Sequence, residues 1–226
     1  MKSEKITDGL ARWYDDACGA AHGLELLGER WSLLVVRELM FGPRRFGELR
    51  AGLPGISANV LTQRLAGLEA AGVVARRRLP PPASVQVYAL TPWGEEVDQV
   101  LMVLGRWAAR SPAHDPTLPI SAASLMLSFR TMFDAGRAGD MQARVGFRFD
   151  HDGFVAAIGD GAITVARAAP EGADLLLQGT PAAVAGLVYG GVSADALEDA
   201  RALAIAGDRG VLARLPALFP LPDKAD

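Results

Sequence analysis

The chain has 226 residues, half of them apolar and 22% charged, with a net charge of −3 and a single cysteine. This length favours two domains, the composition excludes a disordered or collagen-like chain, and one cysteine excludes an internal disulfide framework or a cysteine-cluster metal site. The polar N-terminus is unlike a signal peptide, and the least charged stretch, 175–194, is interrupted by proline and glycines. We therefore expect a cytoplasmic protein that does not cross a membrane.

Helix signals dominate the first half of the chain. Apolar periodicity with helix-ending glycine or proline predicts helices over 20–29, 31–41 and 46–53, and Ser57 is a good N-cap for a fourth helix that runs to about Ala71. Two β-rich runs, 73–79 and 84–90, flank three prolines and predict a hairpin with a long tip. Thr91 and Pro92 open a fifth helix over 93–110. The proline-rich segment 111–119 is the best linker, which predicts domains over 1–112 and 119–226.

The second half mixes strand and helix signals. A helix is expected over 120–135, and further helices over 180–189, after Ser193 and after Asp208. Strands are expected over 142–150, 154–158, 162–168, 174–179 and 203–206, with Asp152-Gly153 and Asp160-Gly161 as turns. This order predicts an α+β domain with a largely antiparallel sheet.

The fourth helix carries the functional argument. Two helices joined by a turn at 52–55 and followed by a basic hairpin have the outline of a winged helix-turn-helix, whose second helix enters the major groove. On a helical wheel, one arc is apolar and must face the core: Val60, Leu61, Leu65 and Leu68. The opposite arc has amide, hydroxyl and methyl groups and no charge, which suits the reading of base edges. We predict that the base-reading residues are Asn59, Thr62, Gln63 and Ala66.

Positively charged residues are concentrated around the predicted helix-turn-helix and hairpin. Residues 30–78 contain nine arginines and three glutamates, a net charge of +6 within an acidic chain, which suits contacts with phosphates. The predicted contacts with the DNA backbone are Arg44, Arg45, Ser57, Arg64, Arg76, Arg77 and Arg78. A solvated basic face is the general alternative. For Arg64, which lies beside the apolar arc, a structural ion pair with Glu38 or Glu48 is a specific alternative.

Residues 18–107 resemble the HxlR family of bacterial winged-helix regulators, a branch near MarR. The resemblance is carried by ERWSLLVVREL (29–39), GPRRFGELRAGLPGIS (42–57), LTQRLAGLEAAGVVAR (61–76), VYALTPWG (87–94) and LGRW (104–107). It implies a homodimer built by the first and fifth helices, which binds a pseudo-palindromic operator in double-stranded DNA and usually represses nearby genes. We expect no cofactor and no metal.

The single cysteine stands at a position that matters in this family. Some members sense aldehydes, quinones or oxidants through a cysteine just before the first conserved helix, and Cys18 matches that position, although Gly19 replaces the proline that often follows. The resemblance therefore implies a redox-sensor role for Cys18, since a thiol at a helix N-terminus can have a lowered pKa. A small buried filler is the alternative.

Residues 119–220 resemble a sterol-carrier-like lipid-binding domain, through FRFDHDGFVAAIGDGAITVARAAPEGADLLLQGT (147–180) and ALAIAGDRGVLARLPALFP (202–220). The resemblance implies a curved sheet and helices around an apolar tunnel, with an apolar small molecule as ligand. Candidate wall residues are Phe129, Phe133, Phe147, Phe149, Leu187 and Tyr189. Ordinary core packing is the alternative for each of them. Joined to the first domain, this predicts a one-component sensor.

Enzymatic function finds no support in the motifs. His22, His114 and His151 are far apart, and the sequence has no H-E-x-x-H, G-x-S-x-G or P-loop pattern. We predict that the protein is not an enzyme. The alternative function is a lipid-binding protein whose winged helix serves as a protein-interaction module, for which charge reversal at 76–78 would leave nucleic-acid binding unchanged.

Overall fold

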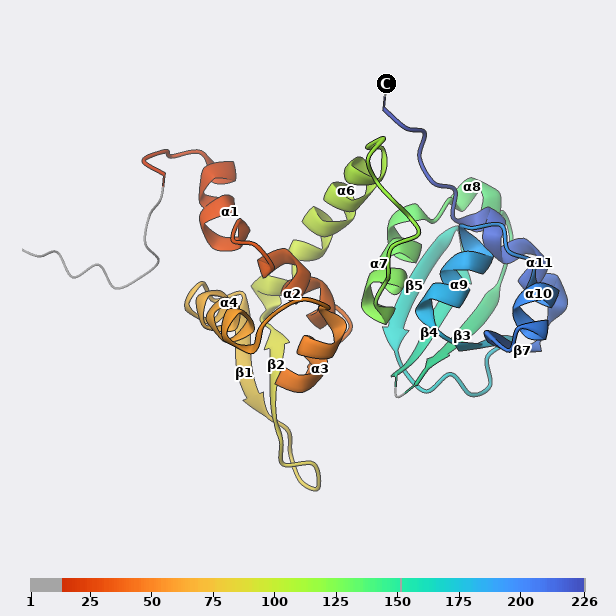
Figure 1. Cartoon of the computed structure of the whole chain (residues 1–226), viewed down its shortest axis with the longest axis horizontal. Helices are drawn as coiled ribbons and strands as arrows, with labels where there is room; N and C mark the ends of the chain where they lie inside the picture. Colours follow the sequence, from red (N-terminus) through yellow and green to blue (C-terminus); the bar gives the residue numbers. More distant parts are fainter. Residues whose placement is uncertain (1–13, 151, 226) are drawn as a thin grey trace, which may run out of the picture. The chain divides into compact units, whose positions relative to one another are not determined.

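A computed structural model describes residues 14–150 and 152–225 of the chain (Figure 1). The chain divides into two compact units, the first ending at Asp98 and the second beginning at Gln99. The polar N-terminal residues 1–13 and His151, considered above, lie outside the described residues. Within the described part, no helix combines the length and the apolar character needed to span a membrane.

The first unit is a small helical bundle with a two-stranded hairpin (Figure 1). Its elements are α1 (Gly19–Leu27), α2 (Ser32–Leu39), α3 (Phe46–Gly52), α4 (Ala58–Ala70), β1 (Val74–Arg78), β2 (Gln86–Leu90) and α5 (Pro92–Glu95). Residues from three helices form its core, among them Val35, Leu49 and Leu65, each at most 1% exposed. This is the predicted order of helix, turn, helix and wing.

Local capping explains where the helices of this unit begin. The hydroxyl of Ser57 accepts a hydrogen bond from the Val60 N–H at 3.2 Å, and that of Thr91 accepts one from the Gly94 N–H at 3.0 Å. Both bonds satisfy N–H groups that have no partner within the helix. The N-caps predicted at Ser57 and Thr91 are therefore confirmed.

The second unit is an α+β domain built on a five-stranded sheet. Its helices are α6 (Val97–Ala109), which spans the boundary between the units, α7 (Ala122–Met132), α8 (Ala135–Ala138), α9 (Pro181–Val188), α10 (Ala194–Asp199), α11 (Arg209–Arg214) and the 3-10 helix η1 (Leu215–Leu218). Its strands are β3 (Ala143–Phe149), β4 (Asp152–Gly159), β5 (Ala162–Arg167), β6 (Leu175–Gly179) and β7 (Leu203–Gly207). The strand order is β5-β4-β3-β6-β7, and only the β3–β6 pair of this sheet is parallel. The prediction of a largely antiparallel α+β domain is confirmed.

The two faces of this sheet differ in character. Helices α7, α9 and α11 contact its strands, and Val145 and Phe147 are fully buried. Arg144, on the opposite face of β3, is exposed. The strand expected over 142–150 is therefore present as β3, with apolar and charged side chains on opposite faces.

Three predicted boundaries are wrong. Asp152-Gly153 is not a turn: both residues belong to β4 and pair with Phe149 and Arg148. The glycine is needed there for space, because a Cβ at Gly153 would lie 2.6 Å from the Ala168 carbonyl oxygen. The turn itself uses Asp150, whose φ is +43°.

The other two corrections are breaks within expected helices. The expected fifth helix over 93–110 is divided at Glu96 into α5 and α6. The first turn is held to the start of the wing, where the Thr91 hydroxyl donates to the Gly72 carbonyl at 2.7 Å. The helix expected over 120–135 ends at Met132, because Phe133 is extended and Asp134 caps the separate helix α8.

Candidate nucleic-acid interface

Helix α4 presents one polar, uncharged face to solvent. Asn59, Thr62, Gln63 and Ala66 are all exposed, whereas Leu61 on the opposite face is fully buried. The Thr62 hydroxyl donates to the Ala58 carbonyl at 2.9 Å, so its methyl group is the part left for an apolar contact. The structure thus places the four predicted base-reading residues together on one surface.

The N-cap of α4 carries a further exposed polar group. The Ser57 hydroxyl oxygen accepts the capping hydrogen bond from the Val60 N–H. This bond uses a lone pair of the oxygen and does not use the hydroxyl hydrogen. Ser57 is exposed and can donate to a phosphate while it caps the helix.

The wing arginines have different surroundings although all three are exposed. The Arg76 guanidinium donates to the Glu69 carboxylate at 3.0 Å and lies over the Tyr88 ring. Arg78 donates from Nε to the Ser84 carbonyl at 3.3 Å, near the tip of the hairpin. The backbone of Arg77 pairs with Val87 of β2, but within the described part of the chain its guanidinium has no hydrogen-bond or ion-pair partner.

The segment before α3 joins the wing. The Arg44 N–H donates to the Tyr88 carbonyl at 2.9 Å, and the Tyr88 N–H donates to the Arg44 carbonyl at 2.8 Å. The next residue, Arg45, has an exposed side chain, and its backbone N–H donates to Glu48 Oε2 at 2.7 Å. These bonds place Arg44 against β2 of the wing and Arg45 at the N-cap of α3.

Arg64 makes an ion pair, but with a different partner from those considered above. Its Nη2 lies 3.0 Å from Glu29 Oε2, in the turn that follows α1. Of the acids first considered, Glu38 accepts from Arg37 and Glu48 caps α3. The partner is Glu29 because α1 packs against α4, a contact that the wheel of a single helix does not reveal.

Similarity to known proteins covers most of the first unit and the helix α6 at its end. Residues 26–115 match the family described as HxlR-like helix-turn-helix. The chain is 39% identical over 83 residues to the HTH-type transcriptional regulator YodB of Bacillus subtilis, covering 37% of this chain and 74% of YodB. The chain belongs to the HxlR-like helix-turn-helix family.

One further relative and a solved structure of YodB extend the comparison for this HxlR-like chain. It is 41% identical over 87 residues to the uncharacterized HTH-type transcriptional regulator sll1512 of Synechocystis, and the match spans 38% of this chain and 64% of sll1512. The structure of reduced YodB from B. subtilis shares 33% identity and covers 44% of this chain and 100% of that one, with a TM-score of 0.40. The curated relatives are thus HTH-type transcriptional regulators, and the family match ends at residue 115.

Cys18 of this HxlR-like chain is an exposed free thiol at the N-cap of α1. The nearby backbone N–H groups of Ala21 and Ala20, at the start of α1, lower the pKa of this thiol. These N–H groups favour the thiolate, which is the reactive form of cysteine. The exposed position does not fit the alternative of a small buried filler.

The aromatic residues predicted to line a ligand tunnel lie together in the second unit. Phe129 stacks on Phe219 with ring centroids 4.6 Å apart and lies 5.5 Å from Phe147 and 6.1 Å from Tyr189. Phe133 is near Phe219, and Phe149 is near Phe147. Leu187 is also buried. The sequence prediction did not include Phe219, although this residue lies in the apolar run 215–219.

A polar pair lies at the edge of this aromatic cluster. Ser128 Oγ is 2.9 Å from Tyr189 Oη, and burial raises the pKa of the tyrosine. A hydroxyl pair among rings provides the kind of polar anchor found in apolar binding sites. It also satisfies the tyrosine hydroxyl within an ordinary core.

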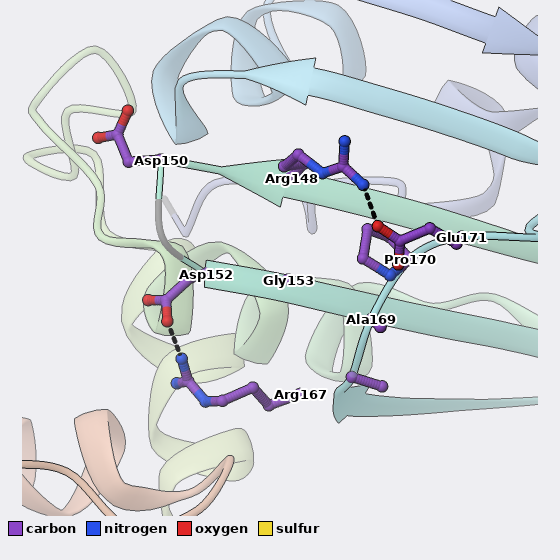
Figure 2. A pocket seen from close by; sticks show the side chains of 9 residues that line it. Arg148, Asp150, Asp152, Gly153, Arg167, Ala169, Pro170 and Glu171 are labelled. Carbon is purple, nitrogen blue, oxygen red and sulfur yellow. Dashed lines mark hydrogen bonds and ion pairs between the residues drawn. The ribbon is translucent and has the colours of Figure 1, made fainter. Parts of the chain in front are cut away.

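Two hollows of the second unit are lined by residues that the sequence did not single out. Figure 2 shows the first, about 390 Å³ in volume, where Arg148 is paired with Glu171 and Arg167 with Asp152. The second lies beside β7, and its lining includes Gln178, Glu198, Arg201 and Ile205. Strand register brings these distant charges together, which is why no local motif reveals them.

The described side chains do not meet the requirements of a metal site. Over residues 14–150 and 152–225, no cluster of three or more histidine, cysteine, aspartate or glutamate side chains could hold a metal ion.

Proposed function

We propose that this protein binds double-stranded operator DNA as a homodimer in a sequence-specific manner and represses transcription. The observation that carries the proposal is the exposed, uncharged face of α4 next to a basic wing. Membership of a family whose curated members are HTH-type transcriptional regulators supports it.

Base reading belongs to the outer face of α4. The amides of Asn59 and Gln63 can form paired hydrogen bonds with adenine edges, and the methyl groups of Thr62 and Ala66 can contact thymine methyl groups. Because none of these side chains is charged, they discriminate bases without adding a sequence-independent attraction to phosphates.

Phosphate contacts belong to the exposed arginines that flank this face. Arg45 precedes α3, and Arg77 lies on the wing, so the two stand on either side of α4 along the chain. Their guanidinium groups supply the salt-dependent part of the affinity and set the orientation of α4 on the duplex.

Dimerisation uses the apolar stripe of α6. Val100, Val103, Leu104 and Trp107 recur at helical spacing, and Val103 and Trp107 are each 70% exposed. An exposed apolar stripe of this kind needs a partner surface. A two-fold pairing through it gives two α4 helices, which suit half-sites about one helical turn, roughly 34 Å, apart.

In this proposal, the second unit binds a small-molecule ligand. An apolar small molecule would enter the cluster around Phe129, with the Ser128–Tyr189 pair as its polar anchor. Such a ligand changes DNA affinity only to the extent that it prefers one conformation of the dimer.

The first experiment is selection of binding sites from sheared genomic DNA with the purified full chain. The matched variant is Asn59→Ala/Gln63→Ala, which removes two amides and no charge. We expect an inverted repeat with the wild type and its loss with the variant. Capture without sequence preference, equal for both proteins, would contradict base reading. Absence of capture would contradict DNA binding and favour the protein-interaction module.

A further inference from the structure

One charged side chain links the wing to the end of α4. Arg76 on β1 donates from Nη2 to Glu69 Oε2 on α4, at 3.0 Å, and its guanidinium carbon lies 5.4 Å from the centre of the Tyr88 ring. Arg76 and Tyr88 are direct cross-strand partners in the hairpin. One guanidinium thus joins α4, β1 and β2.

Tyr88 carries this connection onward. Its side chain is 6% exposed, and its backbone makes both hydrogen bonds of the bridge with Arg44, which precedes α3. The hairpin is therefore fixed on two sides: through Arg76 to α4, and through the Tyr88 backbone to the segment that leads into α3. A planar guanidinium can pair with a carboxylate and stack on a ring at the same time.

The neighbouring arginine has a different environment. Successive side chains of a strand point to opposite faces, so Arg77 points away from the face shared by Arg76 and Tyr88. Its side chain is exposed, and the described residues include no acid paired with it. Two adjacent arginines of one strand thus have different surroundings.

We propose that Arg76 is a positioning residue, which sets the angle between the wing and α4 through Glu69 and Tyr88, and that Arg77 is the wing residue that contacts phosphate. This inference rests on the proposed DNA-binding function. It divides the basic run 76–78 into residues that shape the interface and residues that touch DNA.

A charge swap tests the assignment. Arg76→Glu places two acids together, and Glu69→Arg places two arginines together, so each single variant should bind the selected inverted repeat roughly ten-fold more weakly. The double variant, with arginine at 69 and glutamate at 76, restores the ion pair in the opposite sense. We expect its affinity to return to within about three-fold of the wild type.

Salt dependence provides the second measurement. Arg77→Ala should reduce the slope of log K against log salt concentration by about two, one contact from each protomer, on both the repeat and a shuffled duplex. The swapped double variant should keep the wild-type slope. A double variant that stays as weak as Arg76→Glu, with a slope reduced as for Arg77→Ala, would overturn the inference.

A measurement without DNA separates this inference from the proposed function. Arg76→Ala should speed amide hydrogen exchange in the hairpin over 76–90, whereas Arg77→Ala should leave it unchanged. If the wild type binds no duplex, the proposed function fails. If exchange in the hairpin is the same for both variants, the positioning role fails whether or not DNA is bound.

Discussion

The apolar stripe of α6 gives the sharpest prediction about assembly. Trp107 is 70% exposed in the described chain, and Val103, one turn earlier, is exposed to the same extent. In the proposed dimer, an aspartate at either position places a charge where the partner protomer would pack. We therefore predict that Trp107→Asp and Val103→Asp convert this proposed dimer to a monomer.

The magnitude follows from the exposed area. A tryptophan buries up to about 250 Å², so 70% exposure leaves about 175 Å² for an interface. At about 25 cal/mol per Å² this is worth up to about 4 kcal/mol for each protomer. Association recovers only part of this burial free energy. If half is recovered, the two protomers together still contribute about 4 kcal/mol to the stability of the dimer. The dimer dissociation constant should rise by about three orders of magnitude.

Sedimentation velocity over a range of protein concentrations measures this constant directly. The matched control is Trp93→Asp, because Trp93 is 49% exposed but lies on α5, outside the stripe. The control should stay dimeric, and circular dichroism should show that every variant is folded. An unchanged dissociation constant for folded Trp107→Asp and Val103→Asp would refute the stripe as the dimer surface.

Three further predictions concern single sites. Phe129→Ala should lower the free energy of unfolding by about 3–5 kcal/mol in urea titrations, since a fully buried ring is removed; a loss below about 1 kcal/mol would indicate a loose cluster. Alkylation of Cys18 should be half-maximal at lower pH than that of free cysteine, because the backbone N–H groups at the start of α1 lower the thiol pKa, and Cys18→Ser should abolish any effect of diamide on DNA binding; a persisting effect would exclude the sensor role. Gly153→Ala should cost about 1–3 kcal/mol by thermal unfolding, because its Cβ would meet the Ala168 carbonyl, and a neutral effect would contradict this close approach.

Local chemistry predicts much of the first unit. Ser57 and Thr91 cap the helices that they were expected to cap, and the wheel of α4 separates buried Leu61 from exposed Gln63 as predicted. These features depend on residues within about four positions of one another. The candidate base-reading face could therefore be found from the sequence before the fold was known.

Contacts between elements could not be predicted in this way. The pairing of Arg64 with Glu29 requires α1 to pack on α4, and the pairing of Arg76 with Glu69 requires the hairpin to fold back on α4. The sequence also did not show that the turn before Glu96 is bonded to the start of the wing. Periodicity describes one element at a time and carries no information on its neighbours.

In the proposed complex, the outer face of α4 reads bases while the flanking arginines bind phosphates. The most direct test measures affinity for a library in which each position of the selected repeat is varied in turn, with wild type, Gln63→Ala and Arg77→Ala. We predict that Gln63→Ala loses about 1–3 kcal/mol of discrimination between bases at one symmetric pair of positions in the repeat. Arg77→Ala should weaken binding to every sequence equally. A uniform loss for Gln63→Ala, with the base preferences intact at every position, would contradict the account.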